Sequence, residues 1–208
     1  LPEGTTLAQF TDQYIQSSQK VGPSMADDIK NAAFLAVVFA MFCMAAYILL
    51  RFRDISFSVG AFASVAVTTL CIISFYTLLW KVLPFSMEVD QTFIAAILTI
   101  IGYSINDTVV VFDRIRETIG LYPKRDRYQV INDALNSTLS RTFNTSLTTL
   151  VVVLCIFILG GATIRSFTFA ILLGIIIGTY STLFVATPIA YELQKKKINK
   201  KAAAEAGK

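Results

Sequence analysis

Five long, predominantly apolar stretches alternate with shorter polar connectors along most of the chain. They cover approximately residues 31–50, 57–80, 91–112, 144–163 and 166–192. Each approaches or exceeds the length of about 20 residues with which an α-helix crosses about 30 Å of hydrocarbon. The pattern therefore predicts an all-α polytopic membrane protein with five transmembrane helices.

The polar segments divide the chain into three parts. Residues 1–30 are polar and predict the end of an extracytoplasmic domain, residues 31–193 form the transmembrane bundle, and residues 194–208 form a basic cytoplasmic tail. Within the bundle, residues 113–143 form a charged, amphipathic connector that we expect in the cytoplasm. In the last stretch, Thr187-Pro188 predicts a kink or a helix end.

Composition excludes most other classes of protein. Hydrophobic residues make up 55% of the chain and charged residues only 15%, against about 25% charged in a soluble domain. Histidine is absent, the three cysteines lie inside apolar stretches, and no metal-site or phosphate-loop spacing occurs. We therefore expect no metal, no cofactor other than protons as a coupling ion, no nucleic-acid partner and no ordinary enzymatic activity.

Basic residues predict how the helices are oriented. Fourteen of the 18 Lys and Arg residues fall on one side of the predicted bundle and four on the other. The side with more basic residues is cytoplasmic by the positive-inside rule. Five spans with a cytoplasmic C-terminus place residue Leu1 outside, so we expect a further span upstream of it.

One carboxylate, Asp107, lies inside the third apolar stretch. A charged side chain at this depth costs about 2.5–3.5 kcal/mol on insertion scales, so such a residue is a candidate functional site. Helical spacing places Asp107 on one face with Tyr103 and Asn106. Because the chain has no histidine, any proton chemistry would have to use carboxylates, tyrosine, hydroxyl groups or water, and this face would then be the proton pathway.

A second polar face is predicted at the start of the fourth stretch, where Arg141, Thr145 and Thr148 recur at helical spacing. We expect Arg141 to approach Asp107 inside the bundle, directly or through water, if the fourth helix begins well before residue 141. The alternative is that Arg141 anchors the helix by extending to the membrane interface. Spacing alone leaves both open.

Two further groups of residues have structural roles in this prediction. Asp113, Arg114, Arg116 and Glu117 follow Asp107 and form the interfacial exit that fixes depth and orientation. Gly174 and Gly178 form a GxxxG pattern, which permits close helix packing.

The third stretch also carries a specific resemblance. Residues 102–117 read Gly-Tyr-Ser-Ile-Asn-Asp-Thr-Val-Val-Val-Phe-Asp-Arg-Ile-Arg-Glu, which resembles the signature of the SecF family or of the SecF half of fused SecDF proteins. Residues 139–142 and 145–150 are similar to the next signature of that family, and residues 21–23 resemble the segment that leads into its second span. The resemblance extends from about residue 21 to 192.

This resemblance implies an RND-like half with six spans and a large extracytoplasmic domain between the first two. The chain would then contain spans two to six, without the first span and most of that domain. The implied partners are SecD, fused or separate, the SecYEG translocon, exported preproteins and the lipids of a bacterial inner membrane. The resemblance also implies proton transport by Asp107 and Arg141. One departure is Val67-Thr68, where many relatives are expected to carry a His-Asp pair.

The resulting functional prediction is an accessory subunit of the Sec protein translocase. It would use the proton-motive force to promote export through an intramembrane Asp/Arg proton switch. Two alternatives are an RND-like exporter of lipids or small molecules and a non-conducting structural scaffold of a translocon complex.

Overall fold

A bundle of long helices makes up the computed structural model, which describes residues 23–206 except 84, 86, 88 and 89. The elements are α2 (Pro23–Phe52), α3 (Ile55–Leu79), α4 (Gln91–Leu121), α5 (Arg127–Leu159), α6 (Ala162–Ser181), the π-helix η1 (Thr182–Ala186) and α7 (Thr187–Ala206). Within these described residues there is no strand. Residues 1–22, which belong to the predicted extracytoplasmic segment, lie outside the described residues.

Five helical segments are long and apolar enough to cross a membrane. They are Asn31–Phe52, Ile55–Leu79, Gln91–Leu121, Arg127–Leu159 and Thr163–Lys200. The prediction of an all-α polytopic membrane protein with five transmembrane helices is therefore confirmed. Which end of each helix faces the cytoplasm stays a prediction.

Three of the helices begin directly after an aspartate that caps their first turn. Asp54 and Asp90 precede α3 and α4, and their carboxylates accept hydrogen bonds from the backbone N–H groups of Ser56 at 3.1 Å and Phe93 at 2.9 Å. Asp126 caps α5 in the same way through Gln129 at 3.4 Å. Such caps satisfy N–H groups that have no partner in the first turn.

The connector predicted over residues 113–143 is almost entirely helical. α4 continues to Leu121, α5 already begins at Arg127, and only the short segment between them is a turn. The early start of α5 follows from its apolar stripe, because Val130, Ile131 and Ala134 are buried. Both helices therefore extend beyond the apolar stretches from which they were predicted.

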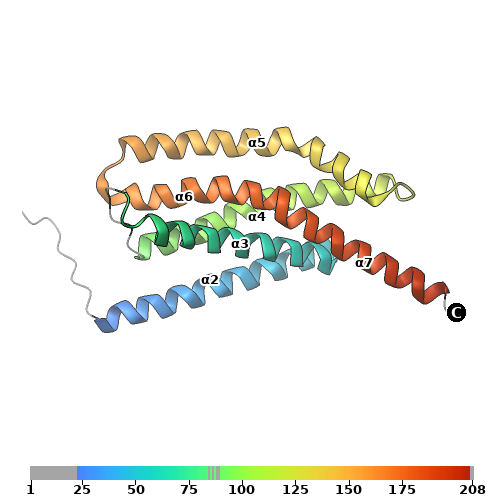
Figure 1. Cartoon of the computed structure of the whole chain (residues 1–208), viewed down its shortest axis with the longest axis horizontal. Helices are drawn as coiled ribbons and strands as arrows, with labels where there is room; N and C mark the ends of the chain where they lie inside the picture. Colours follow the sequence, from blue (N-terminus) through green and yellow to red (C-terminus); the bar gives the residue numbers. More distant parts are fainter. Residues whose placement is uncertain (1–22, 84, 86, 88–89, 207–208) are drawn as a thin grey trace, which may run out of the picture.

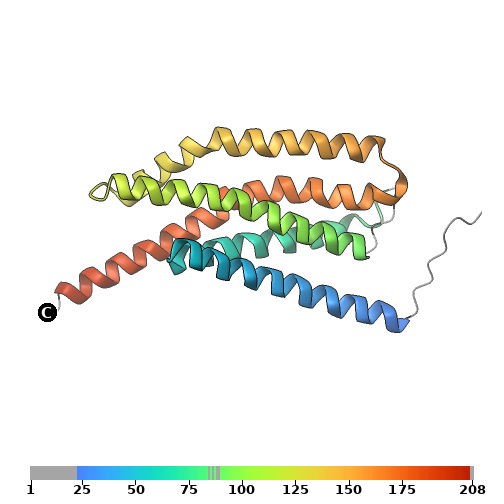
Figure 2. The ribbon, with the colours of Figure 1, turned by 180° about the vertical axis from the view of Figure 1, so that it is seen from behind.

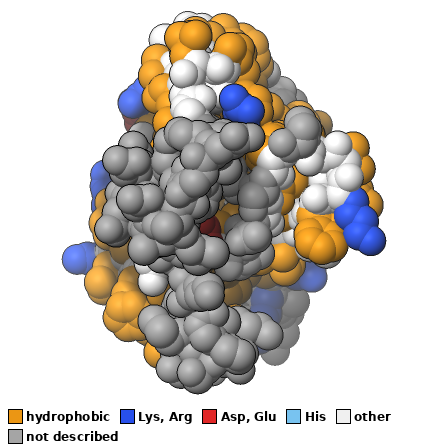
Figure 3. Space-filling view, turned by 90° about the vertical axis from the view of Figure 1, so that its left-hand side faces the viewer, with side chains coloured by type: hydrophobic (Ala, Val, Ile, Leu, Met, Phe, Trp, Pro, Cys, Tyr) orange, Lys and Arg blue, Asp and Glu red, His pale blue; other side chains and the backbone are white. Residues whose placement is uncertain are grey.

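Figures 1 and 2 show the arrangement of the bundle. α5 and α2 form opposite edges, and α3, α4 and α6 lie between them. The tip of the α4–α5 hairpin and the end of α7 project beyond the α2–α3 turn. Seen from the opposite end, where α5 turns into α6, the described side chains are mostly hydrophobic with a few scattered Lys and Arg (Figure 3).

The last span is one long helix with a widened turn in its middle. η1 separates α6 from α7 and is followed directly by Thr187 and Pro188. Proline lacks an N–H group and its ring crowds the carbonyl one turn earlier, so a π turn at this point accommodates it without ending the helix. The predicted interruption at Thr187-Pro188 is therefore a local π turn in a continuous helix.

Candidate intramembrane polar site

The carboxylate of Asp107 lies inside the bundle, with 5% of the residue exposed. The hydroxyl of Ser146 on α5 donates to Asp107 Oδ2 at 3.4 Å, which is long for an O–H···O bond. The same hydroxyl lies 2.7 Å from the hydroxyl of Thr179 on α6. The carboxylate of Asp107 is therefore contacted by a hydroxyl group of α5, which in turn contacts a hydroxyl group of α6.

These contacts belong to a larger group of inward-facing hydroxyls, which we call the hydroxyl layer. Thr108 on α4 and Thr182 in η1 lie 3.0 Å apart, and Ser64 on α3 lies 2.9 Å from Ser181 at the end of α6. The layer consists of Ser64, Thr68, Ser104, Thr108, Ser146, Thr179, Ser181 and Thr182. Helices α3, α4, α5 and α6 and the π turn thus meet around polar groups.

The face of α5 that meets α4 differs from the predicted one. Its buried hydroxyls are those of Thr138, Thr142 and Ser146, spaced one turn apart. Thr145 and Thr148 are exposed, and their hydroxyls donate to the backbone carbonyls of Arg141 and Asn144 in their own helix. The structure therefore corrects the face of α5, and the role of Thr145 and Thr148 in a proton path stays a prediction.

Arg141 lies on the exposed side of α5. It lines a cavity of about 420 Å³ between α4 and α5, together with Asp113, Arg114 and Thr138. Within the described part of the chain, no hydrogen bond or ion pair joins Arg141 to Asp107. The expected condition that the fourth helix begins well before Arg141 is met, but the direct Asp107–Arg141 contact is not made in this structure.

Thr142 lies between this cavity and Asp107. It is 2% exposed, and its hydroxyl has no hydrogen-bond partner among the described residues. With Thr138 one turn before it and Ser146 one turn after it, Thr142 completes a column of hydroxyl groups on α5. This column runs from the cavity that Arg141 lines to the carboxylate of Asp107.

The other residues predicted on the face of Asp107 are less buried. The hydroxyl of Tyr103 donates to Thr149 on α5 at 3.4 Å, so it bridges α4 and α5 away from the carboxylate. Asn106 is exposed. Among the described residues, neither side chain forms a hydrogen bond with Asp107, and their place in a proton path stays a prediction.

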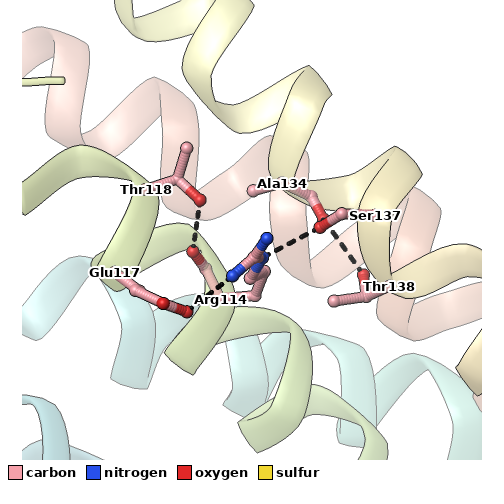
Figure 4. A network of polar contacts seen from close by, with 6 residues as sticks. All are labelled: Arg114, Glu117, Thr118, Ala134, Ser137 and Thr138. Atoms are coloured by element: carbon pink, nitrogen blue, oxygen red, sulfur yellow. Dashed lines mark hydrogen bonds and ion pairs between the residues drawn. The ribbon is translucent and has the colours of Figure 1, made fainter. Parts of the chain in front are cut away.

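The exit of α4 carries surface ion pairs. Asp113 accepts a 2.9 Å contact from Arg51 of α2. Arg114 pairs with Glu117 at 2.8 Å and donates to the hydroxyl of Ser137 on α5 at 3.0 Å, so it links the two helices (Figure 4). These contacts are compatible with an interfacial role.

The two glycines of the GxxxG pattern face α4. A Cβ atom at Gly174 would lie within 2.4 Å of the Ile100 side chain, and one at Gly178 would lie 3.4 Å from Ser104. Gly178 thereby allows α6 to pack closely against α4 at Ser104 of the hydroxyl layer. Within the described residues, no group of three potential metal ligands occurs.

Residues 4–196 match the family model of the C-terminal region of the protein export membrane proteins SecD and SecF. The chain belongs to the SecD/SecF family. The resemblance to SecF, or to the SecF half of SecDF, is thereby confirmed.

Individual relatives agree with this assignment. The chain is 46% identical over 186 residues to the protein translocase subunit SecF of Rhodothermus marinus, covering 89% of this chain and 60% of the relative. It is 42% identical to SecF of Vibrio alginolyticus, covering 83% of this chain and 53% of that protein. The chain thus spans little more than half of these SecF proteins.

Two solved structures share the fold. A crystal structure of SecDF in its super-membrane-facing form matches 95% of this chain and 27% of its own, with a TM-score of 0.77 and 32% identity. The translocon-associated SecDF of Thermus thermophilus matches with a TM-score of 0.75 and 39% identity, over 84% of this chain and 23% of its own. Both solved structures therefore contain the arrangement of transmembrane helices described above.

Sequence reasoning found Asp107 but missed the residues that surround it. Ser146, Thr179 and Thr182 are small hydroxyl residues in apolar stretches, where they attract little attention individually. One usable signal was the recurrence of Thr138, Thr142 and Ser146 at steps of four, which marks a continuous helical face.

Proposed function

We propose that this chain forms the transmembrane part of an accessory subunit of the Sec protein translocase, which uses the proton-motive force to promote protein export. In this proposal it works with SecD, fused or separate, beside the SecYEG translocon and acts on exported preproteins. The observation that carries the proposal is a nearly buried carboxylate, Asp107, inside a membrane helix. Names of the relatives support the Sec pathway, and the site supports proton coupling.

The polar surroundings of Asp107 support a role in proton transfer. An ionised carboxylate inside a bundle is costly unless a cation compensates it, and the hydrogen-bond partner of the Asp107 carboxylate among the described residues is the hydroxyl of Ser146. Hydroxyl groups both donate and accept hydrogen bonds, so they accommodate a protonated or an ionised carboxyl. The column through Thr142 supplies a polar connection toward the Arg141 cavity.

Arg141 is the charge that responds to Asp107 in this scheme. It lies five residues from Ser146, which corresponds to about 7.5 Å along the helix. Ionised Asp107 attracts the guanidinium toward the bundle, and protonation removes that attraction. In this scheme, the state with a protonated Asp107 leaves Arg141 at its cavity and the carboxyl group beside Ser146.

The energy of one proton is sufficient for such a switch. One elementary charge that crosses 100 mV releases about 2.3 kcal/mol, which biases a two-state equilibrium by roughly fifty-fold. The hydroxyl layer and the π turn connect Asp107 to α3 and α6. A change in the ionisation of Asp107 is thus positioned to alter the packing of several helices.

The test compares proton uptake and preprotein export in vesicles that contain the complete protein and its SecD partner. Asp107→Asn should lower both to the level of vesicles without the protein, with unchanged expression and thermal stability. Arg141→Lys keeps the charge but loses the planar fork, so we expect a partial loss. Normal export by Asp107→Asn at normal expression would contradict the proposal.

The same experiment separates the rival functions. A structural scaffold predicts that Asp107→Asn supports export while the complex stays assembled. An RND-like exporter of lipids or small molecules predicts loss of proton coupling without a defect in preprotein export. Only the proposed function predicts that both activities fail together.

A further inference from the structure

A second cavity, of about 350 Å³, lies away from Asp107 at the end of the bundle where the α4–α5 hairpin projects. Five parts of the chain form it: the end of α2 with the α2–α3 turn, the start of α3, the end of α4, the start of α5 and the middle of α7. Segments far apart in sequence therefore build this cavity together. The proton switch proposed above uses none of its residues.

The cavity is strongly basic. Four cationic side chains line it, those of Arg53, Arg116, Arg127 and Lys197, against a single carboxylate, Asp54. Lys197 lies 3.4 Å from that carboxylate. The three arginines have no carboxylate within ion-pair distance in the described part of the chain. The lining thus carries an excess of positive charge. Guanidinium groups are suited to phosphate, because each can donate two parallel hydrogen bonds to the oxygens of a phosphate group.

One wall of the cavity is apolar and firmly packed. Phe52 and Phe57 line it, and each is only 4% exposed. Their ring centroids lie 5.4 Å apart, and both rings pack against Phe112 of α4. Ile119 of α4 and Ile198 of α7 also line the cavity and are more exposed than the two phenylalanines. The cavity therefore offers accessible apolar surface beside its cations, the combination that suits a ligand with an anionic head and a hydrocarbon body.

The backbone of Arg53 is unusual at this site. Its φ angle is 52°, in the left-handed region that residues other than glycine rarely adopt. Such a conformation costs about 1–2 kcal/mol for a residue with a Cβ atom. Glycine would suit the α2–α3 turn better, yet the chain places there an arginine that lines the cavity.

The position of the cavity relative to the membrane decides between ligands. The α2–α3 turn joins two membrane spans, Asn31–Phe52 and Ile55–Leu79, so it lies at a membrane surface. The α4–α5 tip and α7 extend beyond that turn (Figures 1 and 2). The cavity is thus at the level of lipid headgroups, and basic pockets between membrane helices are known to hold anionic headgroups.

We infer that this cavity binds the phosphate group of an anionic phospholipid, with Arg53, Arg116 and Arg127 around the headgroup and Ile119 and Ile198 beside its glycerol and upper acyl region. A bound lipid would join the α2–α3 turn to α4, α5 and α7. The site therefore couples lipid composition to the arrangement of these helices.

The test titrates the complete protein in non-ionic detergent with phosphatidylglycerol and with phosphatidylcholine of the same acyl chains, counting bound lipids by native mass spectrometry. We expect one phosphatidylglycerol to bind at least ten-fold more tightly than phosphatidylcholine. Arg53→Gly and Arg116→Gln should each weaken that binding about five-fold, as expected for one basic residue at a membrane surface. Arg53→Gly also relieves the backbone strain, so its melting temperature should not fall.

Lys196→Gln is the matched control, because Lys196 is an exposed cation on α7 outside the cavity. It should change phosphatidylglycerol binding less than two-fold. Equal affinity for both lipids, or an equal loss in Lys196→Gln and Arg116→Gln, would overturn the inference. A further arm adds glycerol phosphate at millimolar concentration. Complete displacement of the lipid would assign the site to a soluble phosphate and overturn the lipid assignment, whereas retention of the lipid supports it.

Discussion

Two aspartates on the same helix, six residues apart, occupy opposite environments. Asp107 is 5% exposed and is contacted by the hydroxyl of Ser146 at 3.4 Å. The side chain of Asp113 is 41% exposed and pairs with Arg51 at 2.9 Å. Within the described part of the chain, a displacement of about 9 Å along α4 therefore separates a buried carboxylate that has no direct cationic partner from an exposed carboxylate that has one.

The difference shows that a contribution to stability can explain the presence of Asp113 but not that of Asp107. An exposed ion pair such as Arg51–Asp113 contributes about 0–1 kcal/mol and helps to fix the helix at the interface. A buried carboxylate without a cation costs free energy in its ionised form, so stability gives no reason for Asp107. This cost is the reason for which we propose a function for Asp107. The following predictions test the contrast between the two aspartates, from the largest expected effect to the smallest.

The interior of the bundle depends on the close approach of α3 to η1. A Cβ atom at Gly60 on α3 would lie 2.6 Å from the backbone carbonyl oxygen of Ala186 in η1. Backbone cannot move aside as a side chain does, so Gly60→Ala should lower the free energy of unfolding by about 2–3 kcal/mol. Thermal unfolding in detergent measures the change.

Gly102→Ala provides the control on α4, because nothing lies within 4 Å of a Cβ atom there. This variant should be unchanged or up to about 1 kcal/mol more stable, since alanine favours a helix. Equal melting temperatures for the two variants would contradict the close packing of α3 against the π turn.

Ser146→Ala removes the hydroxyl that lies between Asp107 and Thr179. We expect a loss of about 1–2 kcal/mol, because the buried Asp107 and the half-buried Thr179 each lose a partner. Ser137→Ala removes an exposed acceptor of Arg114 and should change stability by less than about 0.5 kcal/mol. Chemical unfolding of both variants side by side checks the comparison, and a larger loss for Ser137→Ala would reverse it.

Thr142→Val should separate stability from activity. Valine has nearly the shape of threonine, and the buried hydroxyl of Thr142 has no recorded partner among the described residues. Its removal should raise stability by about 1 kcal/mol while it interrupts the hydroxyl column and slows proton uptake. A variant that is both less stable and fully active would show that Thr142 has only a packing role.

Asp113→Asn should have the smallest effect. It breaks the Arg51 ion pair, so stability should fall by at most about 1 kcal/mol, and the difference should shrink in high salt. Melting temperatures at low and high salt test this. A salt-independent loss would mean that Asp113 has a buried role that its exposure does not reveal.

The sequence was sufficient to predict the five helices and to identify Asp107. Apolar stretches of membrane length have few alternatives to helix, and one carboxylate inside such a stretch is conspicuous. The inward face of α5 was not predictable in the same way. That helix carries polar residues on two faces, one through Thr138, Thr142 and Ser146 and one through Arg141, Thr145 and Thr148. Packing against α4 decides between them.

Features that several helices build together escaped sequence reasoning for a related reason. The hydroxyl layer combines residues as distant as Ser64 and Ser181, and no local pattern relates them. The basic cavity depends on the path of the α2–α3 turn, including the left-handed backbone of Arg53. The family resemblance supplied the function to be tested but indicated neither feature.

The most direct test of the central claim compares Asp107→Asn with Asp113→Asn in the same vesicles, with proton uptake measured under an imposed membrane potential. Each variant replaces one carboxyl group of α4 by an amide of nearly the same shape. The account predicts that proton uptake falls to background in Asp107→Asn and stays within two-fold of the unmodified protein in Asp113→Asn. Equal uptake by both variants would contradict the claim that the buried carboxylate carries the proton.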